Sequence, residues 1–97
     1  MALAVGLIGL KGHQGTILEG VQRMPEARLV AVCDDDESKL VGVPAWPAAD
    51  AETRTFTDPA AMFDAVAMDL VGICGTDAER APMILAAAER SPTRSAL

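Results

Sequence analysis

The stretch "LAVGLIGLKGHQGTIL", residues 3–18, decides the fold, because an apolar run leads through a glycine-rich turn into a helical pattern. Residues 3–9 are continuous and apolar, which is typical of a β-strand covered on both faces. Residues 14–24 place apolar side chains at helical spacing, and Pro25 ends the pattern. The opening of the chain therefore predicts a strand, a tight turn and a helix.

The remaining sequence repeats this alternation of apolar runs and helical patterns. We expect strands at 27–34, 54–57 and 69–75, helices at 58–67 and 77–90, a short helical turn at 37–43, and a loop at 44–54 with Trp46 against the sheet. Strands separated by helices pair in parallel through right-handed crossovers. The sequence predicts an α/β fold, a partial doubly wound (Rossmann) three-layer structure whose parallel sheet has the order 3-2-1-4.

Gly9, Gly12 and Gly15 form the pattern G-x-x-G-x-x-G at the junction of the first strand and helix. A turn without side chains lets a pyrophosphate approach the backbone, and the N–H groups at the helix start attract it. Gly15 is expected to permit close packing of the helix on the sheet. In the usual spacing, G-x-G-x-x-G, glycines would stand at Lys11 and Gln14, so the turn is of a wider form. The alternative is that these glycines only turn the chain.

Asp34 ends the second apolar run. It follows the glycine motif at the spacing, ~20 residues, at which dinucleotide-binding folds place an acid that binds the ribose. Its carboxylate would accept hydrogen bonds from the ribose and repel a 2′-phosphate, which favours NAD over NADP. The alternative is that Asp34 to Asp36 form a solvated turn.

Further residues around the turn complete the predicted cofactor site. His13 is either a surface residue or a donor to a phosphate, and Gln14 opens the helix beside it. The last predicted strand ends in Cys74, Gly75 and Thr76, at the edge where open parallel sheets bind ligands.

Length, composition and charge limit the kind of protein that contains this site. With 97 residues and a net charge of −6, the chain fits one domain, expected at 1–90 with a disordered tail at 91–97, and scattered basic residues argue against nucleic acid. The sequence lacks an apolar run of the ~20 residues that a membrane span needs, and its start lacks the basic segment of a signal peptide, which predicts a cytoplasmic protein. Cys33 and Cys74 should be free thiols, since two strand spacings, roughly 9–10 Å, exceed disulfide reach. They show no metal-binding spacing.

Four segments, "VGLIGLKGHQGTIL", "LVAVCDDDESKL", "FTDPAAMFDA" and "DLVGICGTDAERAPMILAAAE", together resemble the N-terminal domain of the Gfo/Idh/MocA (glucose-fructose oxidoreductase / inositol dehydrogenase) family over residues 3–90. The resemblance implies an NAD(P)-dependent oxidoreductase that transfers a hydride from CH–OH groups of sugars or polyols. It implies diphosphate contacts for the three glycines and a ribose contact for Asp34. In the loop that the family writes T-P-N-x-x-H, Asp77 replaces the asparagine and Arg80 the histidine.

The family continues into a strand with a Glu-Lys-Pro segment, whose lysine assists catalysis, and then into a substrate domain. This chain instead finishes "ERSPTRSAL", and its lysines are Lys11 and Lys39. We therefore expect a truncated, cofactor-binding portion with no catalytic residue of its own. The alternatives are a stand-alone module that binds NAD(H) or adenine nucleotides and dimerises through an exposed edge of the last strand, and a small enzyme completed by another chain.

Overall fold

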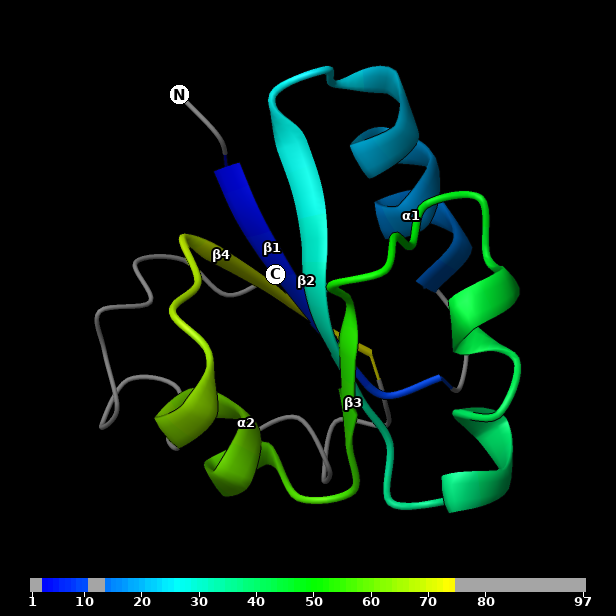
Figure 1. Cartoon of the computed structure of the whole chain (residues 1–97), viewed down its shortest axis with the longest axis vertical. Coiled ribbons are helices and arrows are strands. Elements are labelled where there is room, and N and C mark those ends of the chain that lie inside the picture. Colours follow the sequence, from blue (N-terminus) through cyan, green and yellow to red (C-terminus); the bar gives the residue numbers. More distant parts are fainter. Residues whose placement is uncertain (1–2, 11–13, 75–97) are drawn as a thin grey trace.

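The computed structural model describes residues 3–10 and 14–74, which form an α/β sandwich (Figure 1). In chain order the elements are β1 (Leu3–Ile8), α1 (Gln14–Arg23), β2 (Ala27–Cys33), the 3-10 turns η1 (Glu37–Lys39) and η2 (Val43–Ala45), β3 (Arg54–Phe56), α2 (Pro59–Ala65) and β4 (Leu70–Ile73). The predicted strands and helices within this range are confirmed, with ends up to two residues shorter. The helical turn expected at 37–43 is limited to η1, and η2 extends into the segment expected as a loop. The helix expected at 77–90 lies outside the described residues, as does the tail expected at 91–97.

The four strands form one parallel sheet in the order β3-β2-β1-β4, as predicted. Ile8 at the end of β1 is level with Cys33 of β2 on one side and Ile73 of β4 on the other. All three strands thus finish at the same edge of the sheet. The turn that follows β1 leaves from the middle of this carboxyl edge.

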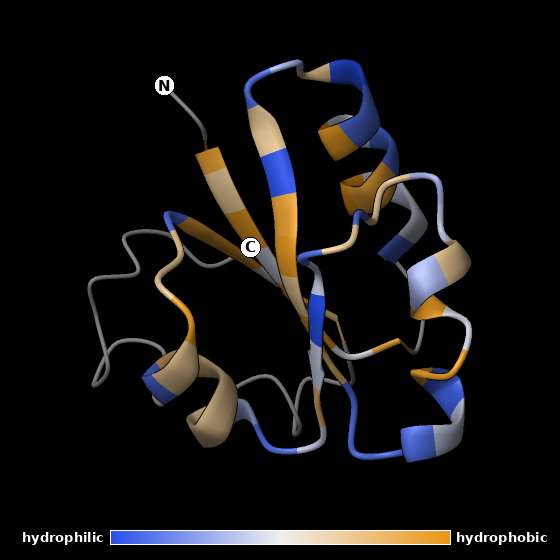
Figure 2. Ribbon diagram, in the orientation of Figure 1, coloured by the Kyte–Doolittle hydropathy of each residue, from blue (hydrophilic) through white to orange (hydrophobic). Residues whose placement is uncertain are grey.

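Helices cover both faces of the sheet, so the central strands are buried on both sides (Figure 1). On one face α1 and the η1 and η2 segments enclose a cluster that includes Leu7, Val32 and Val43. On the other face α2 contributes Met62 and Phe63 to a second cluster. Figure 2 shows the apolar residues concentrated on the strands and on the inward sides of the helices. This two-sided burial explains why the strands read as continuous apolar runs.

Local sequence signals account for the helix ends. Asp58 caps α2 by accepting a hydrogen bond from the Ala60 backbone N–H, and Pro59 occupies the first turn, as predicted. Between β2 and β3 the two 3-10 turns take the place of a longer helix. Trp46, just after η2, packs partly buried against the α1-side cluster, as expected.

β4 is an outer strand of the described sheet, paired with β1, as the sequence predicts, but its side chains are largely buried. Its residues Val71 and Ile73 are 0% and 3% exposed, and only Leu70 is partly accessible. Among residues 3–10 and 14–74, no helix is long and apolar enough to cross a membrane.

Candidate functional site: the turn at the carboxyl edge

The turn after β1 begins at Gly9, which has a positive φ of 88° and is the one such residue in the described part of the chain. Its N–H donates to the Cys33 carbonyl at 2.8 Å, while the Cys74 N–H donates to the Ile8 carbonyl at 2.7 Å. A Cβ at Gly9 would overlap the Cys74 carbonyl oxygen and lie 2.9 Å from the carbonyl carbon. Glycine is thus required at this position by the backbone conformation and by the approach of the chain that leaves β4.

Asp34 lies directly beside this turn. Its carboxylate accepts hydrogen bonds from the Leu10 N–H through Oδ2 and from the Asp36 N–H through Oδ1, each at 2.8 Å. The residue is 2% exposed, so the solvated turn considered for Asp34 to Asp36 is wrong for its first member, while Asp35 and Asp36 are exposed. The carboxylate at the end of β2 and the glycine turn after β1 form a single hydrogen-bonded unit.

Gly15 does not have the packing role expected for it. An added Cβ there would have no atom within 4 Å, so the first turn of α1 faces open space. Close approach of α1 to the sheet is made at Gly72 of β4, where a Cβ would overlap Ile17 Cδ1 and lie 3.2 Å from Cγ1. The packing glycine therefore lies on the strand rather than on the helix, and no described residue packs over Gly15.

The two thiols at this edge are buried, and that of Cys33 is unreactive in character. Both cysteines are free and buried, as predicted, and their side chains belong to the clusters on opposite faces of the sheet. Burial, followed by the negative charges of Asp58, Asp34 and Asp35, raises the pKa of Cys33 to about 12. A thiol held protonated in this way is a poor nucleophile or metal ligand.

The structure therefore brings together Gly9, Asp34 and Cys74 among the predicted site residues, with Gln14 and Gly15 at the start of the following helix. The remaining predicted residues, Gly12, His13, Gly75 and Thr76, lie outside the described residues. Within the described ranges, no group of three or more His, Cys, Asp or Glu side chains could hold a metal ion.

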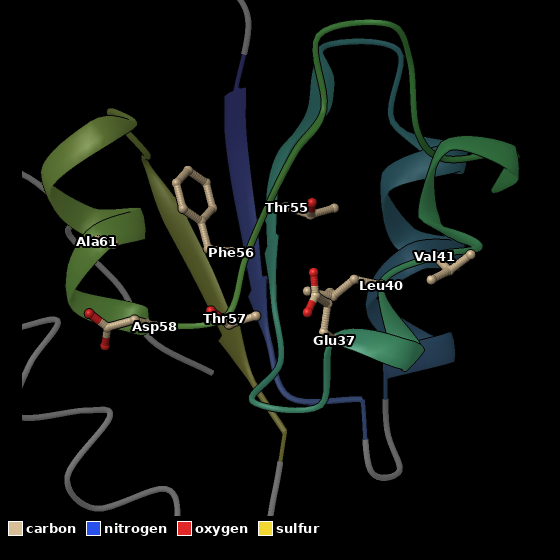
Figure 3. Close-up of a pocket in the computed structure, with 8 residues that line it drawn as sticks. All are labelled: Glu37, Leu40, Val41, Thr55, Phe56, Thr57, Asp58 and Ala61. Carbon is tan, nitrogen blue, oxygen red and sulfur yellow. The ribbon is translucent and has the colours of Figure 1, made fainter.

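A groove of about 460 Å³ lies at the outer edge of β3 (Figure 3). Figure 3 shows it between η1 on one side and the start of α2 on the other. Its lining residues are Glu37, Leu40, Val41, Thr55, Phe56, Thr57, Asp58 and Ala61. This groove was not predicted from the sequence, because it depends on two short segments that meet only in the folded chain.

A second groove, of about 220 Å³ and apolar, lies beside α1 toward the other end of the strands. Leu3 and Leu70, from the starts of β1 and β4, line it together with Met24. It includes none of the predicted site residues.

No protein-family model matches this sequence, and a search of curated proteins finds no relative. Among solved structures, the chain is similar to scyllo-inositol dehydrogenase from Lactobacillus casei, bound to NAD(H) and scyllo-inositol, with 18% identity, a TM-score of 0.77 and 98% of this chain covered. It is similar to a dehydrogenase from Chromobacterium violaceum, with 25% identity, a TM-score of 0.80 and 97% covered. It is also similar to an oxidoreductase from Agrobacterium radiobacter in complex with NAD+, L-tartaric acid and magnesium, with 24% identity, a TM-score of 0.80 and 98% covered.

The chain spans 27% of the length of each of these three proteins. The similarity covers nearly all of this chain and includes inositol dehydrogenases, so the fold is the one implied by the resemblance seen in the sequence. The chain has the Rossmann-type fold that occupies about a quarter of each of these oxidoreductases.

Proposed function

We propose that the chain binds a dinucleotide, NAD(H), as the nucleotide-binding portion of a Gfo/Idh/MocA-type oxidoreductase that acts on CH–OH groups of sugars or polyols. The observation that carries this proposal is the pairing of a positive-φ glycine turn with a buried carboxylate at the carboxyl edge of a parallel sheet. That edge, at the point where the strand order reverses, is where open α/β sheets bind ligands. NAD+ or NAD(H) in the related crystal structures supports the same cofactor here.

In this proposal each part of the site has a separate task. The backbone from Gly9 and the first turn of α1 hold the pyrophosphate, since N–H groups at a helix start attract anions. Gly15 leaves open space for the phosphate oxygens. Asp34 accepts the hydroxyls of the adenosine ribose and, through its charge, disfavours a 2′-phosphate. NAD supplies the hydride acceptor when bound.

The two titratable side chains nearest the carboxyl end of β2, Asp34 and Cys33, do not supply an evident proton acceptor for hydride transfer. Asp34 already accepts two N–H groups, and the Cys33 thiol has a raised pKa and is 1% exposed. Hydride transfer from an alcohol needs a positioned base and a substrate held at near-attack distance. We therefore propose that this chain by itself binds the cofactor without turnover.

A stand-alone nucleotide-binding module is the second candidate. The position of β4 as the outer strand of the described sheet is consistent with it, because such a module would dimerise through this edge. A module is expected to be monodisperse and to melt cooperatively, with a melting temperature that NADH raises. A fragment that depends on the rest of a longer protein is expected to aggregate.

Thermal unfolding with added nucleotide tests the binding proposal. At a NADH concentration ~100 times Kd, the free energy of unfolding should rise by about 2.7 kcal/mol, and NADPH at the same concentration should have a smaller effect. Unchanged melting with NADH at millimolar concentration would contradict the proposal.

Two matched variants of α1 locate the binding site. Gly15→Val fills the open space beside the turn, whereas Gly20→Val makes the same change further along the helix, where an added Cβ also meets nothing within 4 Å. The two changes should alter stability to a similar extent, because both replace a helical glycine with valine, a somewhat better helix former. Only Gly15→Val should abolish the stabilisation by NADH, and equal responses of the two variants would remove the phosphate assignment.

A further inference from the structure

Asp34 is the one charged side chain that is buried within residues 3–10 and 14–74. Burial of a carboxylate is unfavourable unless hydrogen bonds replace the lost water. Here the Leu10 and Asp36 N–H groups supply those bonds, at 2.8 Å each. A carboxylate that only binds a ligand does not need this interior position. The hydrogen bonds of Asp34 to the protein therefore indicate a structural role as well.

The contact with Leu10 fixes the start of the glycine turn. Gly9 is tied to β2 by its N–H bond to the Cys33 carbonyl, and the next N–H along the chain, that of Leu10, points to Asp34 instead of to a backbone carbonyl. Two successive N–H groups of the turn are thus attached to the end of β2. Through the second attachment, one side chain determines where the turn leaves the sheet.

The contact with Asp36 fixes the loop on the other side. The Asp36 carboxylate in turn accepts the Ser38 N–H at 3.0 Å and the Ser38 hydroxyl at 2.6 Å, which starts η1. The loop after β2 is therefore ordered by a relay of side chains that begins at Asp34.

We propose that Asp34 is a positioning residue that fixes Gly9 and Leu10, the described start of the pyrophosphate-binding turn, before the nucleotide arrives, in addition to its contact with the ribose. This inference rests on the proposed function. A carboxylate oxygen can accept two hydrogen bonds, so Oδ1 and Oδ2 each keep a position for a ribose hydroxyl after binding one N–H. One carboxylate thereby couples the phosphate subsite to the ribose subsite.

The test uses inorganic pyrophosphate as the probe, because pyrophosphate has no ribose. Asp34→Asn replaces one acceptor oxygen with an N–H₂ group that cannot bind the Leu10 or Asp36 N–H. Asp35→Asn is the matched control, since Asp35 is the exposed neighbour and the change in charge is the same. Binding is followed by titration of the Gly9 and Leu10 amide resonances in the full chain.

The two roles of Asp34 predict different effects of Asp34→Asn on the affinity for pyrophosphate. If Asp34 served the ribose alone, loss of its negative charge would leave the affinity for an anion unchanged or raise it, as Asp35→Asn should. If Asp34 positions the turn, the affinity of Asp34→Asn for pyrophosphate should be about tenfold lower than that of Asp35→Asn. Pyrophosphate binding that is equal in the two variants, with only NADH weakened by Asp34→Asn, would overturn the positioning role and leave the proposed function intact.

Hydrogen exchange of the unmodified chain gives a second measurement that needs neither a ligand nor a stable variant. The Leu10 amide should be protected to the level of the strand amides although it lies in a turn. Rapid, unprotected exchange of Leu10 would overturn the proposal even if Asp34→Asn fails to fold. If the unmodified chain binds neither NADH nor pyrophosphate, the proposed function fails and, with no anion for the turn to receive, so does the positioning role, whatever the exchange rate of Leu10.

Discussion

Replacement of Gly9 by alanine should cost this domain a large part of its stability. A non-glycine residue at φ 88° is disfavoured by about 1–2 kcal/mol relative to glycine. In addition the new methyl group would overlap the Cys74 carbonyl oxygen and lie 2.9 Å from the carbonyl carbon, and backbone atoms cannot rotate out of the way as a side chain can. Overpacking of this kind costs a further ~1–3 kcal/mol.

The sum, about 2–5 kcal/mol, compares with a total stability of ~5–15 kcal/mol for native domains. Urea unfolding followed by circular dichroism measures the loss. With an m-value of about 1.5 kcal/mol/M, the midpoint for Gly9→Ala should fall by roughly 1.3–3.3 M at an unchanged m-value.

Gly15→Ala is the matched control, because it makes the same chemical change in the same glycine motif. Gly15 lies inside α1 with no atom within 4 Å of an added Cβ, so alanine should raise the free energy of unfolding by about 0.5 kcal/mol. If both alanine variants shift the urea midpoint in the same direction, the turn does not have the geometry described and the reasoning about Gly9 is refuted.

Three further outcomes follow from the packing and the pKa of particular groups. Gly72→Ala should destabilise the chain by ~1 kcal/mol, and Ile17→Val, which removes the overlapping Cδ1, should recover at least half of that loss in a double-mutant cycle of urea midpoints. Burial raises the pKa of Cys33 in the folded state from 9.0 to about 12, so the contribution of this thiol to stability is complete below pH 9 and is lost as the pH rises from 9 to 12. The urea midpoint of the unmodified chain should therefore fall over that pH range more steeply than the midpoint of Cys33→Ala. Asp58→Ala should lower stability by ~1 kcal/mol by leaving the Ala60 N–H at the start of α2 without its cap, as measured by thermal unfolding.

The sequence was sufficient to predict the order of the strands, because each strand buried on both faces is a continuous apolar run and each crossover carries its own signals. The Asp58 cap and Pro59 mark α2 from local chemistry alone, and the structure confirms both. The packing glycine was assigned wrongly to Gly15, because spacing in a motif does not reveal which neighbour each glycine faces. Gly72 looks in the sequence like a mere interruption of an apolar run, and its role is visible only with Ile17 above it.

The hydrogen bond between Asp34 and Leu10 shows a different reason why a contact within a site is not predicted from the sequence. The position of Asp34 at the end of β2 can be read from the sequence, but its partner, Leu10, is 24 residues away and is fixed by register. Because Ile8 pairs with Cys33, the residues that follow these two strands are held side by side at the same edge. A carboxylate just past one strand must then meet the N–H groups of the turn just past the other. In a parallel sheet of this order, the residue proposed to bind the ribose and the turn proposed to bind the phosphate are neighbours before any nucleotide is bound, so a change to one is expected to alter the other.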